Sequence, residues 1–113
     1  MITIAVVQDE SGLLKSCDIH GHAGEGKRGH DIVCAAVSVL ARTAQAVLSG
    51  KEDITVRGGA PGRGVFTLET QANSQAGRDF LAATGAFLVE GLQSVADEYP
   101  GNCVMTITKD WRK

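Results

Sequence analysis

A cysteine lies near the start of an apolar stretch that follows a glycine-rich segment. The stretch from Ile32 to about Leu48 has the pattern of a helix, which Ser49-Gly50 would end and Asp31 would cap. Cys34 would then lie in the first helical turn, where unpaired backbone N–H groups and the helix dipole favour an anion. Such a position lowers the pKa of a thiol and indicates a nucleophile. A cysteine with apolar neighbours is equally compatible with a small buried side chain.

A histidine within hydrogen-bond reach would complete this chemistry, because it can activate the thiol and then protonate a leaving amine. His22 precedes Cys34 by twelve positions, and the glycines of the intervening segment allow the chain to fold back. His20 belongs to a strand-like run, and His30 lies too near Cys34 in sequence to approach it easily. His22 is therefore the favoured base, with the other two histidines as competitors.

Other polar residues near the cysteine allow two interpretations each. Asp31 could cap the helix, orient the histidine, or do both. Ser38 and Arg42 follow Cys34 at four-residue steps, so the three form one stripe that either lines a cleft or is the solvated edge of the helix. The remaining cysteines, Cys17 and Cys103, lie in strand-like runs and are expected to be inert.

A phosphate-binding loop is a poor explanation of the glycine-rich segment. Residues 21–28 match a Walker A pattern except at the last position, where Arg28 stands in place of the Ser or Thr that holds Mg²⁺. The helix also begins too late, and Asp31 at its start would repel a phosphate.

A metal site is a lesser alternative. Donor atoms for zinc are available from His20, His22, His30, Asp31 and Cys34. Their spacing matches no standard zinc signature. The sequence therefore predicts no metal and no cofactor.

The composition limits the classes of protein to which the chain can belong. With 113 residues, the chain is expected to form one domain spanning 1–113. The formal charge of −2 gives no electrostatic footprint for direct binding of nucleic acid. An odd number of cysteines without a signal peptide favours a cytoplasmic location. The most apolar run, Ile32 to Ala41, is too short to span a membrane.

The hydrophobic pattern predicts seven elements in the order β-β-α-β-β-α-β. The expected strands are Ile2–Val7, Leu13–His20, Ile54–Arg57, Val65–Thr70 and Val104–Thr108, and the expected helices are Ile32–Leu48 and Ser74–Glu98. In the first hairpin, Leu13, Cys17 and Ile19 share one side of the second strand. A turn or loop is expected over Gly58–Gly64. The inner side of the second helix is expected to comprise Phe80, Leu81, Thr84, Phe87, Leu88, Leu92 and Val95. Such an order favours an α+β two-layer sandwich, a mostly antiparallel sheet with both helices on one face.

One motif is specific enough to indicate a family. The sequence Gly21-His22-Ala23, followed at a fixed distance by Gly29-His-Asp31-Ile-Val-Cys34-Ala-Ala-Val-Ser38, resembles the ribosomal-processing cysteine proteases (the Prp or YsxB-like family). The resemblance extends over the whole chain in length and element order, although its specific part is confined to residues 21–38.

The resemblance implies a cytoplasmic, homodimeric cysteine endopeptidase that removes a short N-terminal extension from a large-subunit ribosomal protein. It places the nucleophile on Cys34 and the base on His22, with Asp31 and Ser38 as auxiliary residues. The substrate-binding loop would include Gly21, Ala23 and Gly29. The implied partners are the extended ribosomal segment and a second copy of the chain, with no membrane and no direct nucleic acid. The main alternative is a non-catalytic ribosome-associated module that captures a peptide.

Overall fold

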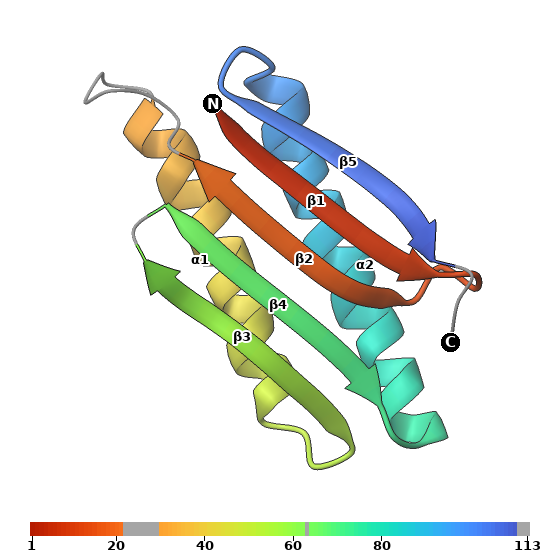
Figure 1. The fold of residues 1–113 in the computed structure, drawn as a ribbon. Coiled ribbons are helices and arrows are strands. Elements are labelled where there is room, and N and C mark those ends of the chain that lie inside the picture. Colours follow the sequence, from red (N-terminus) through yellow and green to blue (C-terminus); the bar gives the residue numbers. More distant parts are fainter. Residues whose placement is uncertain (22–29, 63, 111–113) are drawn as a thin grey trace.

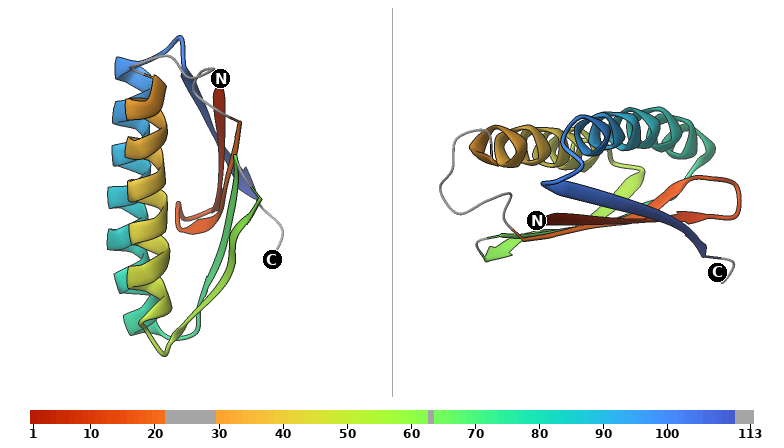
Figure 2. Two further views of the ribbon diagram at one scale, coloured as in Figure 1. Left: turned by 90° about the vertical axis from the view of Figure 1, so that its left-hand side faces the viewer. Right: turned by 90° about the horizontal axis from the view of Figure 1, so that it is seen from above.

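The computed structural model describes residues 1–21, 30–62 and 64–110, with only the backbone described for His30 and Asp31. Five strands and two helices form two layers, with both helices on one face of the sheet (Figures 1 and 2). The strands are β1 (Ile2–Asp9), β2 (Leu14–Gly21), β3 (Ile54–Gly62), β4 (Val65–Ala72) and β5 (Cys103–Asp110), and the helices are α1 (His30–Ser49) and α2 (Gln75–Glu98). The predicted fold class and element order are confirmed.

The sheet has the strand order β3-β4-β2-β1-β5. Three neighbouring pairs are antiparallel, whereas β1 and β5 run parallel. Helix α2 joins β4 to β5 on the helical side of the sheet, so that β5 can lie beside β1 in the same direction.

One core lies between the sheet and the helices. Alternate residues of the strands point into it where the pairing is regular, and α1 contributes a stripe at three- and four-residue steps. Its most completely buried large side chains are Ile4, Val6, Val33, Leu48, Leu68, Leu81, Leu88 and Leu92. Burying a Leu or Val side chain of this kind stabilises the fold by roughly 1.5–3 kcal/mol.

A register irregularity in β2 changes which leucine enters the core. Val7 of β1 pairs with Ser16, but the next residue, Gln8, pairs with Leu14, so that Lys15 is an extra residue in β2. As a result Leu14, and not Leu13, is buried on the same side as Cys17 and Ile19. The predicted alternation was wrong at this end of the strand, because simple period-2 counting cannot anticipate a bulge.

The glycine-rich run after Arg57 is not the loop that the sequence predicted. Strand β3 continues to Gly62 and pairs with β4, with an irregularity between Gly59 and Gly62. Gly58 has a φ of +120°, and a β-carbon there would lie within 2.1 Å of the Thr67 carbonyl oxygen. Glycine at this position allows the close approach that the pairing needs.

Helix α2 begins where the sequence predicted. Ser74 is its N-cap, and the side chain of this residue accepts a hydrogen bond of 2.9 Å from the N–H of Gly77. Leu81, Leu88 and Leu92 are buried as expected, but Phe87 is 75% exposed. One step along a helix turns a side chain by about 100°, which carries Phe87 to the outer face.

Helix α1 begins two residues earlier than the predicted start at Ile32. It starts at His30, which makes Asp31 its second residue, so the N-cap role predicted for Asp31 is not supported by the helix bounds. By length and composition, Ile32–Ser49 could cross a membrane, contrary to the shorter apolar run expected from the sequence. In the fold, Val33, Val37 and Leu48 of this helix pack onto the sheet as core residues.

The Ser74 cap gives a direct test of the fold. Ser74→Ala removes the hydroxyl that accepts from the N–H of Gly77 and donates to the carboxylate of Asp53 at 2.5 Å, and it is expected to lower the free energy of unfolding by about 1 kcal/mol in urea denaturation. Ser94→Ala is the matched control, because this exposed hydroxyl only donates to the carbonyl oxygen of Glu90 within the same helix. Its replacement is expected to be neutral or slightly stabilising. Equal effects of the two substitutions would contradict the assigned cap.

Candidate active site

Cys34 lies in the first turns of α1, at the border between its buried and exposed faces. Its neighbour Val33 is fully buried, whereas Cys34 is half-buried and packs against the edge of the core. Ser38 and Arg42, which follow it on the same stripe, are exposed. The side chain of Cys34 therefore packs against the core on one side and borders a solvated surface on the other, as a nucleophile requires.

The flank of α1 that carries Cys34 faces β3. Gln45 lies eleven residues, or close to three turns, after Cys34, which places both on the same side of the helix. The side-chain amide of Gln45 donates a hydrogen bond of 3.3 Å to the carbonyl oxygen of Gly58. This contact orients the helix about its axis relative to the glycine-rich end of β3. Sequence reasoning did not identify Gln45, although its spacing from Cys34 was a usable signal.

The other two thiols are unsuited to catalysis. Cys17 is completely buried, and burial raises the pKa of its thiol to about 12, with a smaller contribution from the charge of Asp18. Burial also raises the pKa of Cys103. Both thiols are therefore held in the neutral, unreactive form, which supports the expectation that they are structural.

Gly21 ends β2 immediately before His22 and is held on two sides. It pairs with Ile2 of β1, and its N–H donates a hydrogen bond of 2.8 Å to the carbonyl oxygen of Gly64, at the turn between β3 and β4. Its φ is +100°, and a β-carbon would lie 2.3 Å from the carbonyl oxygen of Met1. Because consecutive Cα atoms are about 3.8 Å apart, this anchor fixes where the chain that carries His22 begins.

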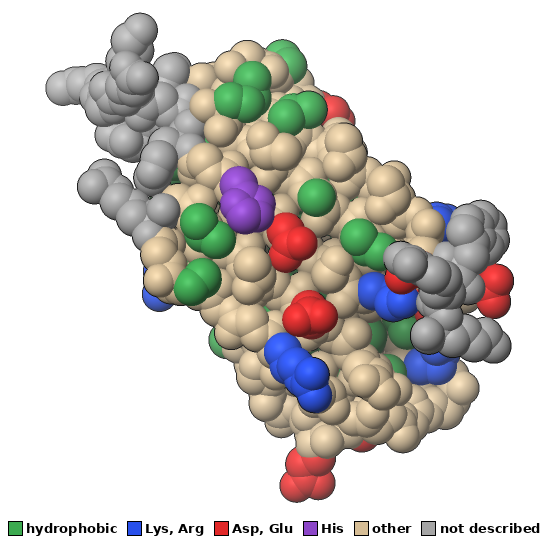
Figure 3. Space-filling view, in the orientation of Figure 1, with side chains coloured by type: hydrophobic (Ala, Val, Ile, Leu, Met, Phe, Trp, Pro, Cys, Tyr) green, Lys and Arg blue, Asp and Glu red, His purple; other side chains and the backbone are tan. Residues whose placement is uncertain are grey.

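One histidine competitor is separated from the cysteine by the sheet. His20 precedes Gly21 in β2, and its side chain is exposed on the open face of the sheet (Figure 3). Residue alternation in β2 places Ile19 in the core and His20 on the opposite side. Helix α1 packs on the core side, so His20 and Cys34 lie on opposite faces of the sheet and His20 is not the base.

Several predicted site residues lie outside the described part of the chain. These are His22, Ala23 and Gly29, together with the side chains of His30 and Asp31. The pairing of Cys34 with His22 and the orienting role of Asp31 therefore stay predictions. The metal alternative also depends on these residues and is not tested.

Comparison with known proteins identifies the family. A model of the family described as cysteine protease Prp matches residues 1–104. A search of curated proteins finds no match.

Solved structures share the fold over nearly the whole chain. SMU.848 from Streptococcus mutans is 27% identical, with 97% of this chain and 96% of that chain covered and a TM-score of 0.80. The essential ribosomal processing protease Prp from S. aureus, in complex with a substrate peptide, is 22% identical, with coverage of 95% and 99% and a TM-score of 0.78. The same S. aureus protease with a covalently linked product peptide is 23% identical, with the same coverage and a TM-score of 0.80.

The fold and the half-exposed thiol at a helix start are those of a cysteine protease. The chain belongs to the cysteine protease Prp family.

The three thiols are expected to differ sharply in reactivity. In native protein at neutral pH, iodoacetamide should modify Cys34 first, because it is the only one of the three that is not buried. Cys17 and Cys103 should react only after unfolding, since burial raises the pKa of both. Mass spectrometry of digested protein measures the rate at each site, with Cys34→Ala as the control. Comparable native rates at all three sites would refute an activated Cys34.

Proposed function

We propose that this protein is a cytoplasmic endopeptidase that removes the N-terminal extension of a large-subunit ribosomal protein with a Cys34–His22 dyad. The observation that carries the proposal is the family match over residues 1–104, combined with a half-buried Cys34 at the start of α1. The anchored position of Gly21 also supports the proposal, because Gly21 directly precedes His22 in the chain.

The reaction proceeds by covalent catalysis. His22 takes the proton of Cys34, and the thiolate attacks the scissile carbonyl carbon. Backbone N–H groups at the start of α1 stabilise the oxyanion of the tetrahedral intermediate. Protonated His22 then gives its proton to the leaving amine, which leaves a thioester on Cys34. Water hydrolyses the thioester, with His22 again accepting a proton, and the thiol is restored.

The substrate is expected to be an extended peptide segment that enters beside Cys34 near the loop containing Gly21, Ala23 and Gly29. The S. aureus structures contain a substrate peptide in one case and a covalently linked product peptide in the other. A covalently linked product is the species that thioester chemistry predicts. Exposed Ser38 lies one turn beyond Cys34 on the same stripe and is an auxiliary contact for the peptide.

Cleavage of the extended ribosomal protein tests the proposal. Cys34→Ala and His22→Ala are each expected to lower the rate by at least about 10³-fold, because each removes one half of the catalytic unit. Cys103→Ala is the control and should retain activity if the variant folds. Gel or mass-spectrometric detection of the released extension gives the rate. Intact substrate that still binds the wild-type protein would support the peptide-binding module instead.

We also propose that the protein is a homodimer that associates through the outer face of its helices. A groove of 470 Å³ between α1 and α2 is lined almost entirely by apolar atoms. Val39 is 64% exposed and Phe87 is 75% exposed along this groove. Exposed apolar surface of this kind usually marks an interface.

The shape of the groove supports a two-fold arrangement. Phe87 projects from α2, and the small side chains of Thr43, Ala83 and Thr84 line the hollow beside it. In a two-fold dimer, the Phe87 of each copy would enter the hollow of the other, because each surface patch meets its own equivalent. Ring burial at two symmetric positions supplies the apolar core that a dimer interface needs.

Charge placed at Phe87 should separate the two copies. Phe87→Glu is expected to halve the molar mass measured by size-exclusion chromatography with light scattering, while the far-UV circular dichroism stays unchanged. Val104→Glu is the control, because Val104 is an exposed apolar residue of the edge strand β5 whose register partner, Thr3, is also exposed. A dimeric Phe87→Glu protein would place the interface elsewhere, and a monomeric wild-type protein would contradict the dimer.

A further inference from the structure

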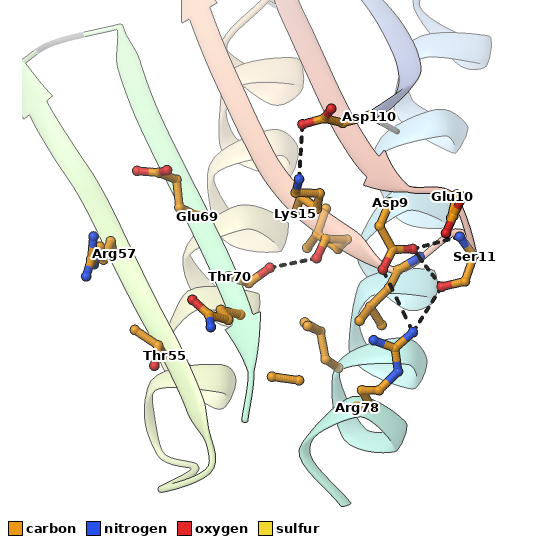
Figure 4. A pocket seen from close by; sticks show the side chains of 15 residues that line it. Asp9, Glu10, Ser11, Lys15, Thr55, Arg57, Glu69, Thr70, Arg78 and Asp110 are labelled. Atoms are coloured by element: carbon orange, nitrogen blue, oxygen red, sulfur yellow. Dashed lines mark hydrogen bonds and ion pairs between the residues drawn. The ribbon is translucent and has the colours of Figure 1, made fainter. Parts of the chain in front are cut away.

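A second cleft lies at the far end of the sheet from Cys34, where β2 begins and β4 finishes. Its volume is 720 Å³, and its walls come from the β1–β2 turn, the end of β4 and the first turns of α2 (Figure 4). The start of α1, the helix that carries Cys34, lies near the opposite end of β2 (Figure 1). At about 3.3 Å per residue, the seven steps from Leu14 to Gly21 separate the two regions by about 23 Å.

The cleft exists because two neighbouring strands stop pairing before both have ended. The β2–β4 ladder ends at the pair Ser16 and Glu69, whereas β4 continues to Ala72 alongside β3. At the mouth of the gap, the Thr70 hydroxyl donates a hydrogen bond of 2.9 Å to the carbonyl oxygen of Leu14. Beyond this bond, no strand among the described residues pairs with the side of β4 that faces away from β3.

Backbone direction shows which groups face the cleft. The N–H of Asn73 donates to the carbonyl oxygen of Asp53, on the β3 side. Successive residues of a strand point their N–H and C=O groups to alternate sides, so those of Ala72 point away from β3 and toward the cleft. Neither ladder uses the N–H of Ala72. An extended chain laid in the cleft can therefore pair with Ala72 through two hydrogen bonds.

The side chains around the cleft indicate which kind of peptide segment could bind there. Leu14 and Leu81 form an apolar floor. Around the rim, Lys15 bonds Asp110 at 3.0 Å and Arg78 lies 3.8 Å from Asp9.

The cations of those two pairs are neutralised by their partners. Among the described residues that line the cleft, Glu10, Glu69 and Arg57 remain outside these two pairs, which leaves one net negative charge. This surface suits an apolar side chain flanked by lysine or arginine.

We propose that this cleft is a docking site for an extended, lysine- or arginine-bearing segment of the protein substrate, which adds to the edge of β4 at Ala72. The inference rests on the proposed function, since a processed ribosomal protein continues beyond the scissile bond. Proteins that bind RNA carry such basic segments. About seven extended residues match the length of β2 from Gly21 to Leu14, so one extended chain is long enough to reach both ends of the sheet.

A backbone substitution tests the docking site. Ala72→Pro removes the N–H that points into the cleft and leaves the β3 ladder intact, because that ladder does not use this donor. In the Cys34→Ala background, it is expected to weaken binding of the fluorescently labelled mature ribosomal protein about tenfold, measured by anisotropy. Unchanged affinity in a folded variant would overturn the proposal.

A charge substitution gives a second test that does not depend on proline. Glu10→Lys combined with Glu69→Lys reverses the sign of the rim and is expected to weaken the same binding about tenfold at low salt. Glu90→Lys combined with Glu98→Lys makes the same charge change at exposed positions of α2 away from the cleft. Equal losses in the two double variants would overturn the docking site.

Cleavage of a short peptide that spans only the scissile bond separates this proposal from the proposed function. With Cys34 present, the cleft variants should cleave that peptide at the wild-type rate and lose about tenfold in kcat/KM on the full-length protein. No cleavage of either substrate by the wild-type enzyme would refute the proposed function. Equal losses on both substrates would overturn the docking site alone.

Discussion

The packing of one stripe of α1 against the sheet is the constraint on which the site depends. Val33, Val37 and Leu48 follow one another on a single helix face and are buried together against the strands. Because a helix is a rigid rod, burying this stripe fixes the direction of every other side chain around it. Cys34 occurs one position after a fully buried valine, so its half-exposed position follows from the core. The Gln45 contact with β3 adds a second point of attachment on the same flank.

Most of the fold could be predicted because its elements are encoded locally. Strand alternation, helix periodicity and the Ser74 cap each depend on residues close in sequence, and they gave the correct element order. The errors have non-local causes. The extra residue at Lys15 depends on how β1 and β2 align, and the outward direction of Phe87 depends on which face of α2 meets the sheet. Residues 58–62 join β3 because β4 can approach glycine closely.

The site could be predicted in part. Cys34 at a helix start followed from the sequence pattern, and the structure shows that its side chain is partly exposed. The sequence favoured His22 as the base, and the structure adds that His20 faces away from α1. The choice between His22 and His30 stays a prediction. The cleft at Ala72 had no sequence signal. It arises because the pairing between β2 and β4 stops at Glu69, whereas β4 continues to Ala72 beside β3. No unusual residue in the sequence marks either position.

The contact between Gly21 and Met1 has a practical consequence for how the protein is produced. The carbonyl group of Met1 lies where a β-carbon of residue 21 would be, so the amino end of the chain sits directly against the strand that leads to His22. A purification tag fused in front of Met1 would leave the fold beside this strand. Tag residues at that point would lie next to the end of β2, beside the anchored Gly21. Enzyme assays on this protein are best made with the amino-terminal tag removed.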